Sequence, residues 1–247
     1  MRTIAFVNHK GGVGKTTSVI NIAAGLVKKK YKVLTIDADP QANLTTSLLG
    51  ANEPKKSIKD SFSKDEPLPI LIYDTNFSIV PSTLDFSGIE LEISNRIARE
   101  TILRELINNI EKKFDYCLID CPPSLGLITL NALVAANEVI IPTEAEFLAY
   151  RGIDTIVGVI EKVKKHFNPN LRLSGVFFTK YQEQKVLTKM ITDKIEECFQ
   201  SMLLKTRIRV NVSLAESQAK AKDIFEYAPK SNGAADYMEL VKEIIKL

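Results

Sequence analysis

The sequence predicts an α/β fold in three layers, with a mostly parallel sheet and helices on both of its faces. Short apolar runs of strand length alternate along the chain with amphipathic stretches of helical period, which is typical of this class. A glycine-rich segment, residues 10–17, directly follows the first apolar run, residues 3–7. Two later runs end in aspartates, Asp37 and Asp120. Because parallel strands place their carboxyl ends at one edge of the sheet, we expect these groups to lie close together.

The glycine-rich segment KGGVGKTT matches the second half of the phosphate-loop pattern G-x-x-x-x-G-K-[ST], with His9 in place of the first glycine. Backbone N–H groups and a helix N-terminus converge on an anion in such a loop. We expect Lys15 to contact the β- and γ-phosphates and the Thr16 hydroxyl to bind Mg²⁺. An ordinary tight turn is the alternative, which the two motifs below disfavour. The predicted nucleotide-binding residues are Lys10, Gly11, Gly12, Val13, Gly14, Lys15, Thr16 and Thr17.

The same string resembles the deviant Walker A motif of the ParA/MinD group of P-loop ATPases, in which the additional lysine, here Lys10, is the signature. The resemblance implies an ATP-sandwiched homodimer in which this lysine reaches the phosphates held by the partner. It also implies slow Mg²⁺-dependent ATP hydrolysis that a ParB-like centromere-binding protein stimulates.

Length and composition are those of one globular domain. The chain has 247 residues, of which 45% are hydrophobic and 26% charged, so we expect a single ATPase domain over residues 1–247. The first strand begins by Thr3, so we expect no DNA-binding domain ahead of it. The net charge of +3 is small, and any affinity for nucleic acid must come from a local patch. Three cysteines without a spaced framework, no secretory signal and no long apolar run predict a cytoplasmic protein.

The second motif is DADPQAN, which follows an expected helix over residues 17–30 and an expected buried strand over residues 33–36. It resembles the family string D-x-D-P-Q-G-N, with Ala42 in place of the glycine. The resemblance implies that Asp39 positions the attacking water and that Asp37 orders Mg²⁺ and its water shell. A helix cap is the alternative for two acids before a proline, but their place after the second strand favours catalysis.

Between the second and third motifs the sequence is less regular. Polar residues and three prolines predict loops with one short helix over residues 50–69. Strands are expected at residues 70–73 and 77–81, the second being the stronger. Helical spacing predicts a long amphipathic region over residues 84–114 that packs on the sheet. Its predicted core stripe is Ile97, Ile102, Leu103, Leu106, Ile107 and Ile110.

The third motif is an apolar run over residues 116–119 that ends in Asp120, which is a Walker B pattern. The carboxylate at such a strand tip holds Mg²⁺, in this family through a water molecule. Cys117 and Cys121 flank the aspartate. A bridged iron–sulfur cluster, as in the related nitrogenase iron protein, is the alternative to buried core residues, which we favour for both thiols.

The last part of the chain continues the alternation of strands and helices. We expect a strand at residues 138–142, a helix at 146–166, a strand at 171–179 and a closing helix at 233–247. The closing helix balances two lysines against two glutamates, so we expect it to pack on the domain and not to anchor it in a membrane. His9 and His166 lack the partners of a metal site or a nucleophile system.

Two arginines of the Soj-like branch of the family are missing. Alignment of GVFFT with the family strand places Gln184 where the first arginine stands, with Lys185 next to it. Alignment of residues 208–217 with the second family segment places Val210 and Ser213 at its two arginine positions.

Basic residues nevertheless gather near these positions. Six of them, against three acids, lie between residues 205 and 230, which suits phosphate contacts without base readout. We therefore expect weak, salt-sensitive, nonspecific DNA binding by the ATP-bound dimer, and a nucleoid-associated protein. A solvated surface is the alternative for the basic stretch. The candidate DNA-binding residues are Lys185, Arg207, Arg209, Lys220 and Lys222.

The sequence therefore predicts an ATPase that segregates plasmid or chromosomal DNA together with a ParB-like partner. The alternative is a ParA/MinD-like switch that positions a cargo other than DNA or acts at a membrane or in metabolism. The missing arginines favour the alternative, whereas the near-continuous match of the first 150 residues favours partition.

Overall fold

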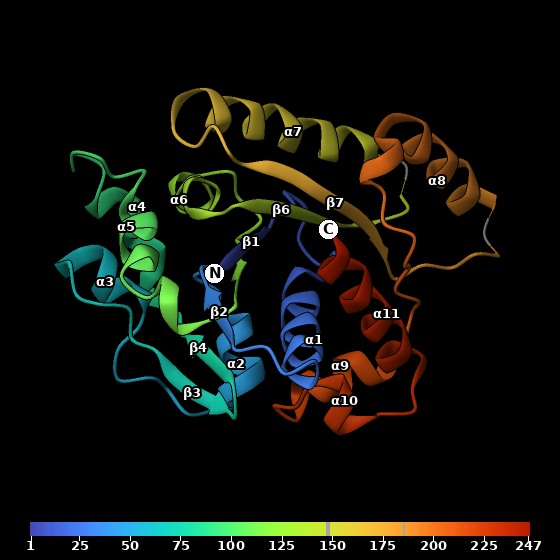
Figure 1. Cartoon of the computed structure of the whole chain (residues 1–247), viewed down its shortest axis with the longest axis horizontal. Coiled ribbons are helices and arrows are strands. Elements are labelled where there is room, and N and C mark those ends of the chain that lie inside the picture. Colours follow the sequence, from blue (N-terminus) through green and yellow to red (C-terminus); the bar gives the residue numbers. More distant parts are fainter. Residues whose placement is uncertain (147–148, 185) are drawn as a thin grey trace.

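The computed structural model describes residues 1–146, 149–184 and 186–247, and within these ranges the chain forms a seven-stranded sheet flanked by helices (Figure 1). The strands lie in the order β3-β4-β2-β5-β1-β6-β7. All neighbouring pairs are parallel except β3 and β4, which form an antiparallel edge. The mostly parallel sheet is confirmed. The strands are β1 (Arg2–Phe6), β2 (Val33–Asp37), β3 (Leu71–Asp74), β4 (Phe77–Val80), β5 (Tyr116–Asp120), β6 (Glu138–Glu144) and β7 (Arg172–Thr179).

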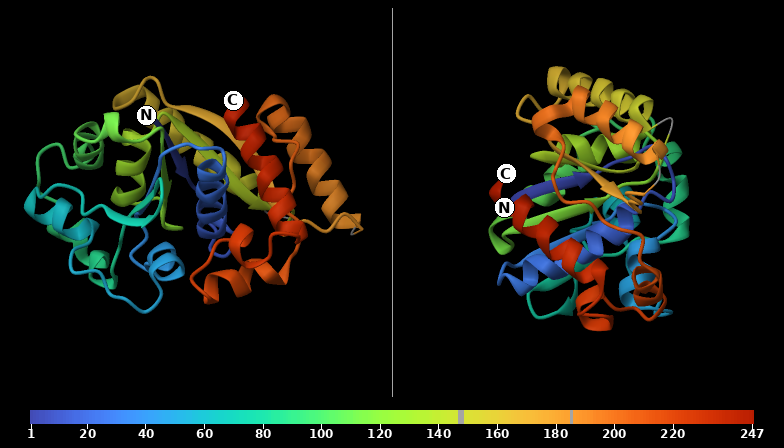
Figure 2. Two further views of the ribbon diagram at one scale, coloured as in Figure 1. Left: turned by 60° about the horizontal axis from the view of Figure 1, so that its bottom comes forward. Right: turned by 90° about the vertical axis from the view of Figure 1, so that its right-hand side faces the viewer.

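Helices cover both faces of the sheet and complete the three predicted layers (Figure 2). Successive strand residues point to opposite faces, so Ile4 and Phe6 lie in one apolar core and Ala5 and Val7 in the other. The first core contacts α1 (Lys15–Lys28), α2 (Asn43–Leu49), α9 (Val212–Ala219), α10 (Ile224–Tyr227) and α11 (Asn232–Lys246). The second contacts α3 (Ile58–Lys64), α4 (Ile89–Glu92), α5 (Ile102–Asn108), α6 (Leu127–Ala135), α7 (Ala149–His166) and α8 (Val186–Phe199).

The prediction of one long helical region over residues 84–114 is wrong in two respects. The region is not continuous, and one residue of the predicted core stripe is exposed. The structure breaks it into a 3-10 turn (Leu84–Gly88), α4, α5 and a second 3-10 turn (Glu111–Lys113). Ala98 between α4 and α5 has a left-handed backbone, with φ 57°, which no α-helix accommodates. Ile97 consequently points to solvent and is 93% exposed. The rest of the stripe packs inward, with Leu106 partly buried and Ile102, Leu103, Ile107 and Ile110 buried.

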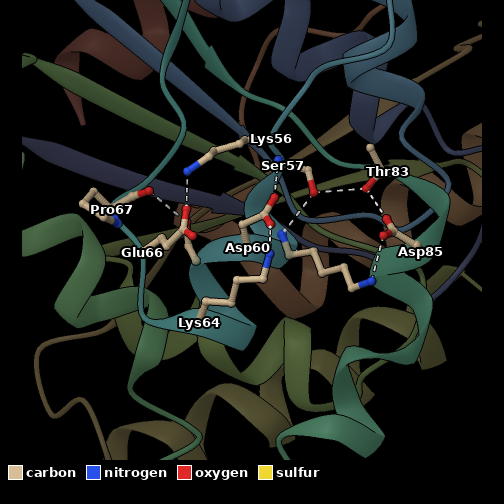
Figure 3. A network of polar contacts seen from close by, with 10 residues as sticks. Lys56, Ser57, Asp60, Lys64, Glu66, Pro67, Thr83 and Asp85 are labelled. Atoms are coloured by element: carbon tan, nitrogen blue, oxygen red, sulfur yellow. Dashed lines mark hydrogen bonds and ion pairs between the residues drawn. The ribbon is translucent and has the colours of Figure 1, made fainter.

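The short helix expected between residues 50 and 69 is α3, and polar contacts fix both of its ends (Figure 3). Ser57 caps the first turn, and the Asp60 carboxylate accepts a hydrogen bond from the Ser57 N–H at 3.0 Å. Lys64 in the last turn pairs with Asp60 at 2.8 Å. Lys59 pairs with Asp85, which follows β4, at 2.7 Å. These contacts close both ends of α3 and tie it to the 3-10 turn after β4.

The closing helix packs on the domain, as predicted. Tyr237, Leu240, Val241 and Ile244 of α11 are buried against α1, beside which α11 runs (Figures 1 and 2). No helix in the described part of the chain is both long and apolar enough to span a bilayer. Cys117 and Cys121 are also buried, in the core on the other face of the sheet.

Candidate functional site

The glycine-rich loop lies at the carboxyl end of β1, which is buried between β5 and β6. Gly12 and Gly14 have left-handed backbones, with φ of 78° and 80°, a conformation that side chains with a Cβ disfavour. Gly14 is the N-cap of α1, so the helix starts at Lys15, two residues earlier than expected. The two glycines thus turn the chain sharply from β1 into the N-terminus of α1, as an anion-binding loop requires.

Lys15, Thr16 and Asp120 meet at the base of this loop. The Lys15 ammonium is buried and donates hydrogen bonds to the carbonyls of Asn8 at 3.1 Å and Lys10 at 3.2 Å. Burial lowers the Lys15 pKa, although the Asp120 charge opposes this. The Thr16 hydroxyl donates to Asp120 Oδ2 at 2.7 Å. The loop therefore brings a cation and a hydroxyl to the tip of β5.

These groups fit a magnesium site. Asp120 is fully buried, and its Oδ1 has no hydrogen-bond partner among the residues that the structure describes. Burial, with the nearby Asp37 carboxylate, raises the Asp120 pKa well above its usual value. A buried carboxylate oxygen without a donor beside a threonine hydroxyl is a pair of hard oxygen ligands, the type that Mg²⁺ prefers.

Asp37 and Asp39 occupy different environments at the end of β2. Asp37 is fully buried, and its Oδ2 accepts hydrogen bonds from the Thr45 N–H at 2.8 Å and the Thr45 hydroxyl at 2.7 Å. Its Oδ1 accepts from the Asp39 N–H at 3.1 Å. Burial raises the Asp37 pKa to about 7, although these hydrogen bonds act in the opposite direction and lower it. Asp37 thus holds the loop that carries Asp39, and lies beside Asp120 in the β2–β5 register.

Asp39 faces a cavity of about 530 Å³, which is within the range of small-ligand pockets. Its Oδ1 accepts a hydrogen bond from the Gln41 N–H at 2.9 Å, which leaves Oδ2 without a recorded partner in the described structure. The phosphate loop and the Asp39 loop therefore border one space, as the sequence predicts. The cavity is lined by Gly11, Gly12, Gly14, Lys15, Thr16, Thr17, Asp39, Gln41, Asn43, Ser47, Pro123, Gln218 and Ala219.

Six of the lining residues were not predicted as site residues: Gln41, Asn43, Ser47, Pro123, Gln218 and Ala219. The Gln218 side chain accepts a hydrogen bond from the Thr17 hydroxyl at 3.0 Å and donates one to Ser47 at 3.3 Å. It thereby bridges α1 and α2 from α9, about 200 positions along the chain from Thr17. Asn43 belongs to the DADPQAN motif, and Ser47 lies four residues further along α2, but no local pattern marks Gln218, because only the packing of α9 against α2 brings it to the cavity.

Lys10 does not line this cavity. Its ammonium forms an ion pair with the Glu146 carboxylate, and its N–H donates to Asn8 Oδ1 at 3.0 Å. The side chain is 47% exposed and, with Glu146, lines a neighbouring cavity. A lysine in this place is not directed at phosphates held by its own chain.

Comparison with known proteins agrees with this geometry. A family model described as an AAA domain matches residues 1–173. Sporulation initiation inhibitor protein Soj of Bacillus subtilis is 35% identical over 98% of this chain and 98% of its own length. Chromosome partitioning protein ParA of Myxococcus xanthus is 35% identical over 99% of this chain and 88% of its own. The chain belongs to the ParA/MinD family of P-loop ATPases.

A solved structure supports the same assignment. Cobyrinic acid a,c-diamide synthase from Mycobacterium smegmatis, with a bound ATP analogue and magnesium, superposes on this ParA-family ATPase with a TM-score of 0.86. The two are 31% identical, and the match covers 100% of this chain and 95% of that one. A relative of this ATPase therefore binds the ligand pair that Lys15, Thr16 and Asp120 are suited to hold.

The candidate DNA-binding residues of this ParA-family ATPase are not equally accessible. Lys185 lies outside the described residues. Lys220 is exposed at the end of α9, whereas Lys222 pairs with Glu226. Arg207 lies over the Tyr181 ring, 4.7 Å from its centroid.

Arg209 has a structural partner that the sequence pattern did not reveal. Its guanidinium holds Asp236 of α11, with the shortest contact at 2.6 Å, and its N–H donates to the same carboxylate at 3.0 Å. A phosphate would have to compete with Asp236 for this side chain. Among the candidate cations that the structure describes, Lys220 is therefore the one for which no ion pair or ring contact is found.

Proposed function

We propose that this ParA/Soj-like ATPase is a nucleotide switch that dimerises around ATP and Mg²⁺ and hydrolyses ATP slowly until a ParB-like protein stimulates it. One observation carries the proposal: Lys15, Thr16 and Asp39 border the same cavity, and the Thr16 hydroxyl donates to Asp120 at the tip of β5. In this proposal the whole of residues 1–247 acts as one ATPase domain, in the cytoplasm and on the nucleoid.

The chemistry proposed is in-line attack of water on the γ-phosphate. Asp39 positions the water, and Lys15 and the partner's copy of Lys10 neutralise charge on the phosphates. Thr16 and Asp120 hold Mg²⁺, which supplies further charge neutralisation when bound. Asp37 keeps the Asp39 loop in place through the Asp39 N–H and through Thr45, and would order Mg²⁺ and its water shell.

The proposed cargo is DNA, bound without sequence preference by the ATP-bound dimer. Lys220 and Lys222 supply phosphate contacts near the end of α9, and Arg207, over the Tyr181 ring, supplies a further one. The same helix carries Gln218 in the nucleotide cavity, so the surface and the nucleotide site share one element. Affinity that depends on a few lysines falls steeply with salt.

The test uses an Asp39→Ala variant, which traps the ATP dimer if Asp39 positions the water. Retardation of nonspecific duplex DNA is measured with ATP, with ADP and with no nucleotide, across a salt series. We expect retardation with ATP alone and a decline with salt. The double variant Lys220→Glu/Lys222→Glu should abolish it, whereas Lys242→Glu on α11, an exposed lysine paired with Glu239, should leave it unchanged.

A cargo other than DNA is the second candidate. It is supported by Gln184 and Ser213, which stand at family arginine positions, and by the engagement of Arg209 with Asp236. Absence of DNA binding in every nucleotide state, with the ATP dimer confirmed by sedimentation, would favour this candidate over partition.

A further inference from the structure

Two consecutive residues at the end of β7 hold two consecutive carbonyls of the phosphate loop. The buried Thr179 hydroxyl donates to the Val13 carbonyl at 2.8 Å. The Lys180 ammonium donates to the Gly12 carbonyl at 2.7 Å. Neither residue is among those that line the nucleotide cavity, so both contacts lie on the outer side of the loop.

Lys180 is held in position for this contact. Its backbone is left-handed, with φ 48°, an uncommon conformation for a residue with a long side chain. Glu144 at the end of β6 pairs with its ammonium at 2.9 Å, and the Glu144 side chain is only 16% exposed. β6 and β7 pair at Glu144 and Thr179, so the sheet fixes the distance between the ion pair and the loop.

The carbonyls of the loop are mostly bound by protein donors. Lys15 binds the carbonyls of Asn8 and Lys10, and the Ser18 hydroxyl binds that of Gly14 at 2.6 Å. A phosphate that draws the Lys15 ammonium toward itself removes the Lys15 contacts. The Thr179 and Lys180 contacts do not depend on Lys15 and survive that change.

We propose that Lys180, together with Thr179, is a positioning residue that holds the phosphate loop open for nucleotide from its outer side. In a trans peptide the carbonyl and the following N–H point in opposite directions. Donors on the carbonyls of Gly12 and Val13 therefore turn the N–H groups of Val13 and Gly14 toward the cavity. The positive charge of Lys180 also polarises the Gly12–Val13 peptide and strengthens its N–H as a donor to phosphate.

The experiment measures the dissociation constants of ADP and ATP, each with Mg²⁺, for the wild type and for Lys180→Met, which keeps the stem and removes the charge. We expect both constants to rise by about 3- to 10-fold, equally for the two nucleotides, because the loop holds the phosphates that they share. KM should rise with them, and kcat should stay within about 2-fold. Lys180→Arg, which retains a donor, should recover most of the affinity.

Glu144→Gln is the matched control, because it removes the charge of the ion pair but keeps a side-chain oxygen that can still hold the Lys180 ammonium beside the Gly12 carbonyl. It should change the dissociation constants by less than about 2-fold. Unchanged nucleotide affinity in Lys180→Met would overturn the proposal. An equal loss in Glu144→Gln would also overturn it, since the ion pair and not the loop carbonyl would then be the cause. Thr179→Val, which removes only the hydroxyl, should weaken both nucleotides further when combined with Lys180→Met.

Discussion

The Lys10 ammonium and the Glu146 carboxylate form an ion pair that ties the phosphate loop to the segment after β6. The two side chains are 47% and 56% exposed, so the pair contributes less than about 1 kcal/mol. In the proposed dimer Lys10 reaches the partner's phosphates and must first leave Glu146. The ion pair is thus a small barrier to dimerisation.

Glu146→Gln should therefore promote the ATP-bound dimer. We expect the dimer to form at an ATP concentration up to about 5-fold lower, measured by sedimentation velocity in the Asp39→Ala background. Glu161→Gln is the matched control, because Glu161 also pairs with a lysine, Lys164, but on the exposed side of α7. A Glu146→Gln variant that dimerises no more readily than the control would contradict this role of the ion pair.

Arg209 should matter more for stability than for DNA binding. Asp236, only 10% exposed, loses its main partner when Arg209 is replaced by Gln, although the Arg209 N–H still donates to it. We expect the free energy of unfolding to fall by about 1 to 2 kcal/mol in urea titrations. Retardation of DNA should fall less in the Arg209→Gln variant than in the Lys220→Glu variant. Equal loss of DNA binding in the two variants would show that Arg209 leaves Asp236 for phosphate.

Glu138 should make stability depend on pH below neutrality. The carboxylate is 2% exposed and accepts hydrogen bonds from Arg2 at 2.7 Å and Arg172 at 2.9 Å. Burial opposes its ionisation, but the hydrogen bonds from the two arginines outweigh burial and lower the pKa to about 2. A folded pKa below the usual 4.5 means that the stabilisation is complete above about pH 5 and is lost as pH falls toward 2.

The measurement compares the wild type with Glu138→Gln by urea unfolding between pH 7 and pH 3. The variant should be about 2 kcal/mol less stable at pH 7, less than for a fully buried pair because Arg172 is largely exposed. The difference should shrink as pH falls through 4. A constant difference over this range would exclude the titration of Glu138 as its cause.

The backbone at Ala42 should be strained, and a glycine at this position should relieve the strain. It stands where the family string has glycine, and its φ of 53° places it in the left-handed region. Ala42→Gly should raise the free energy of unfolding by about 0.5 to 1 kcal/mol, the relief of strain exceeding the added entropy of the unfolded chain. Ala51→Gly, at a nearby exposed residue without positive φ, should not stabilise the protein. Equal effects of the two substitutions would contradict the strain.

Much of the fold and the core of the site follow from local patterns. The apolar runs before His9, Asp37 and Asp120 are strands because parallel strands buried on both faces need continuous apolar sequence. The glycines of the phosphate loop and the aspartates at the strand ends stand in short motifs, and the residue types of these motifs indicate their chemistry. The break between α4 and α5 was missed, because it depends on the backbone angle of one residue, Ala98. The helical spacing of the apolar side chains does not reveal such an angle.

The sequence by itself determined the phosphate loop and the two carboxylate strands, because each is encoded within a few consecutive residues. Tertiary structure decided which side chains are free to act. Arg209 is held by Asp236, Lys10 by Glu146, and Gln218 reaches the cavity from α9. Each of these contacts joins residues that are far apart in the chain, and the sequence spacing of the two residues does not predict the contact. Only tertiary contacts, among them the packing of α9 against α2 and of α11 against α1 and the pairing of β1 with β6, bring the partners within hydrogen-bonding distance.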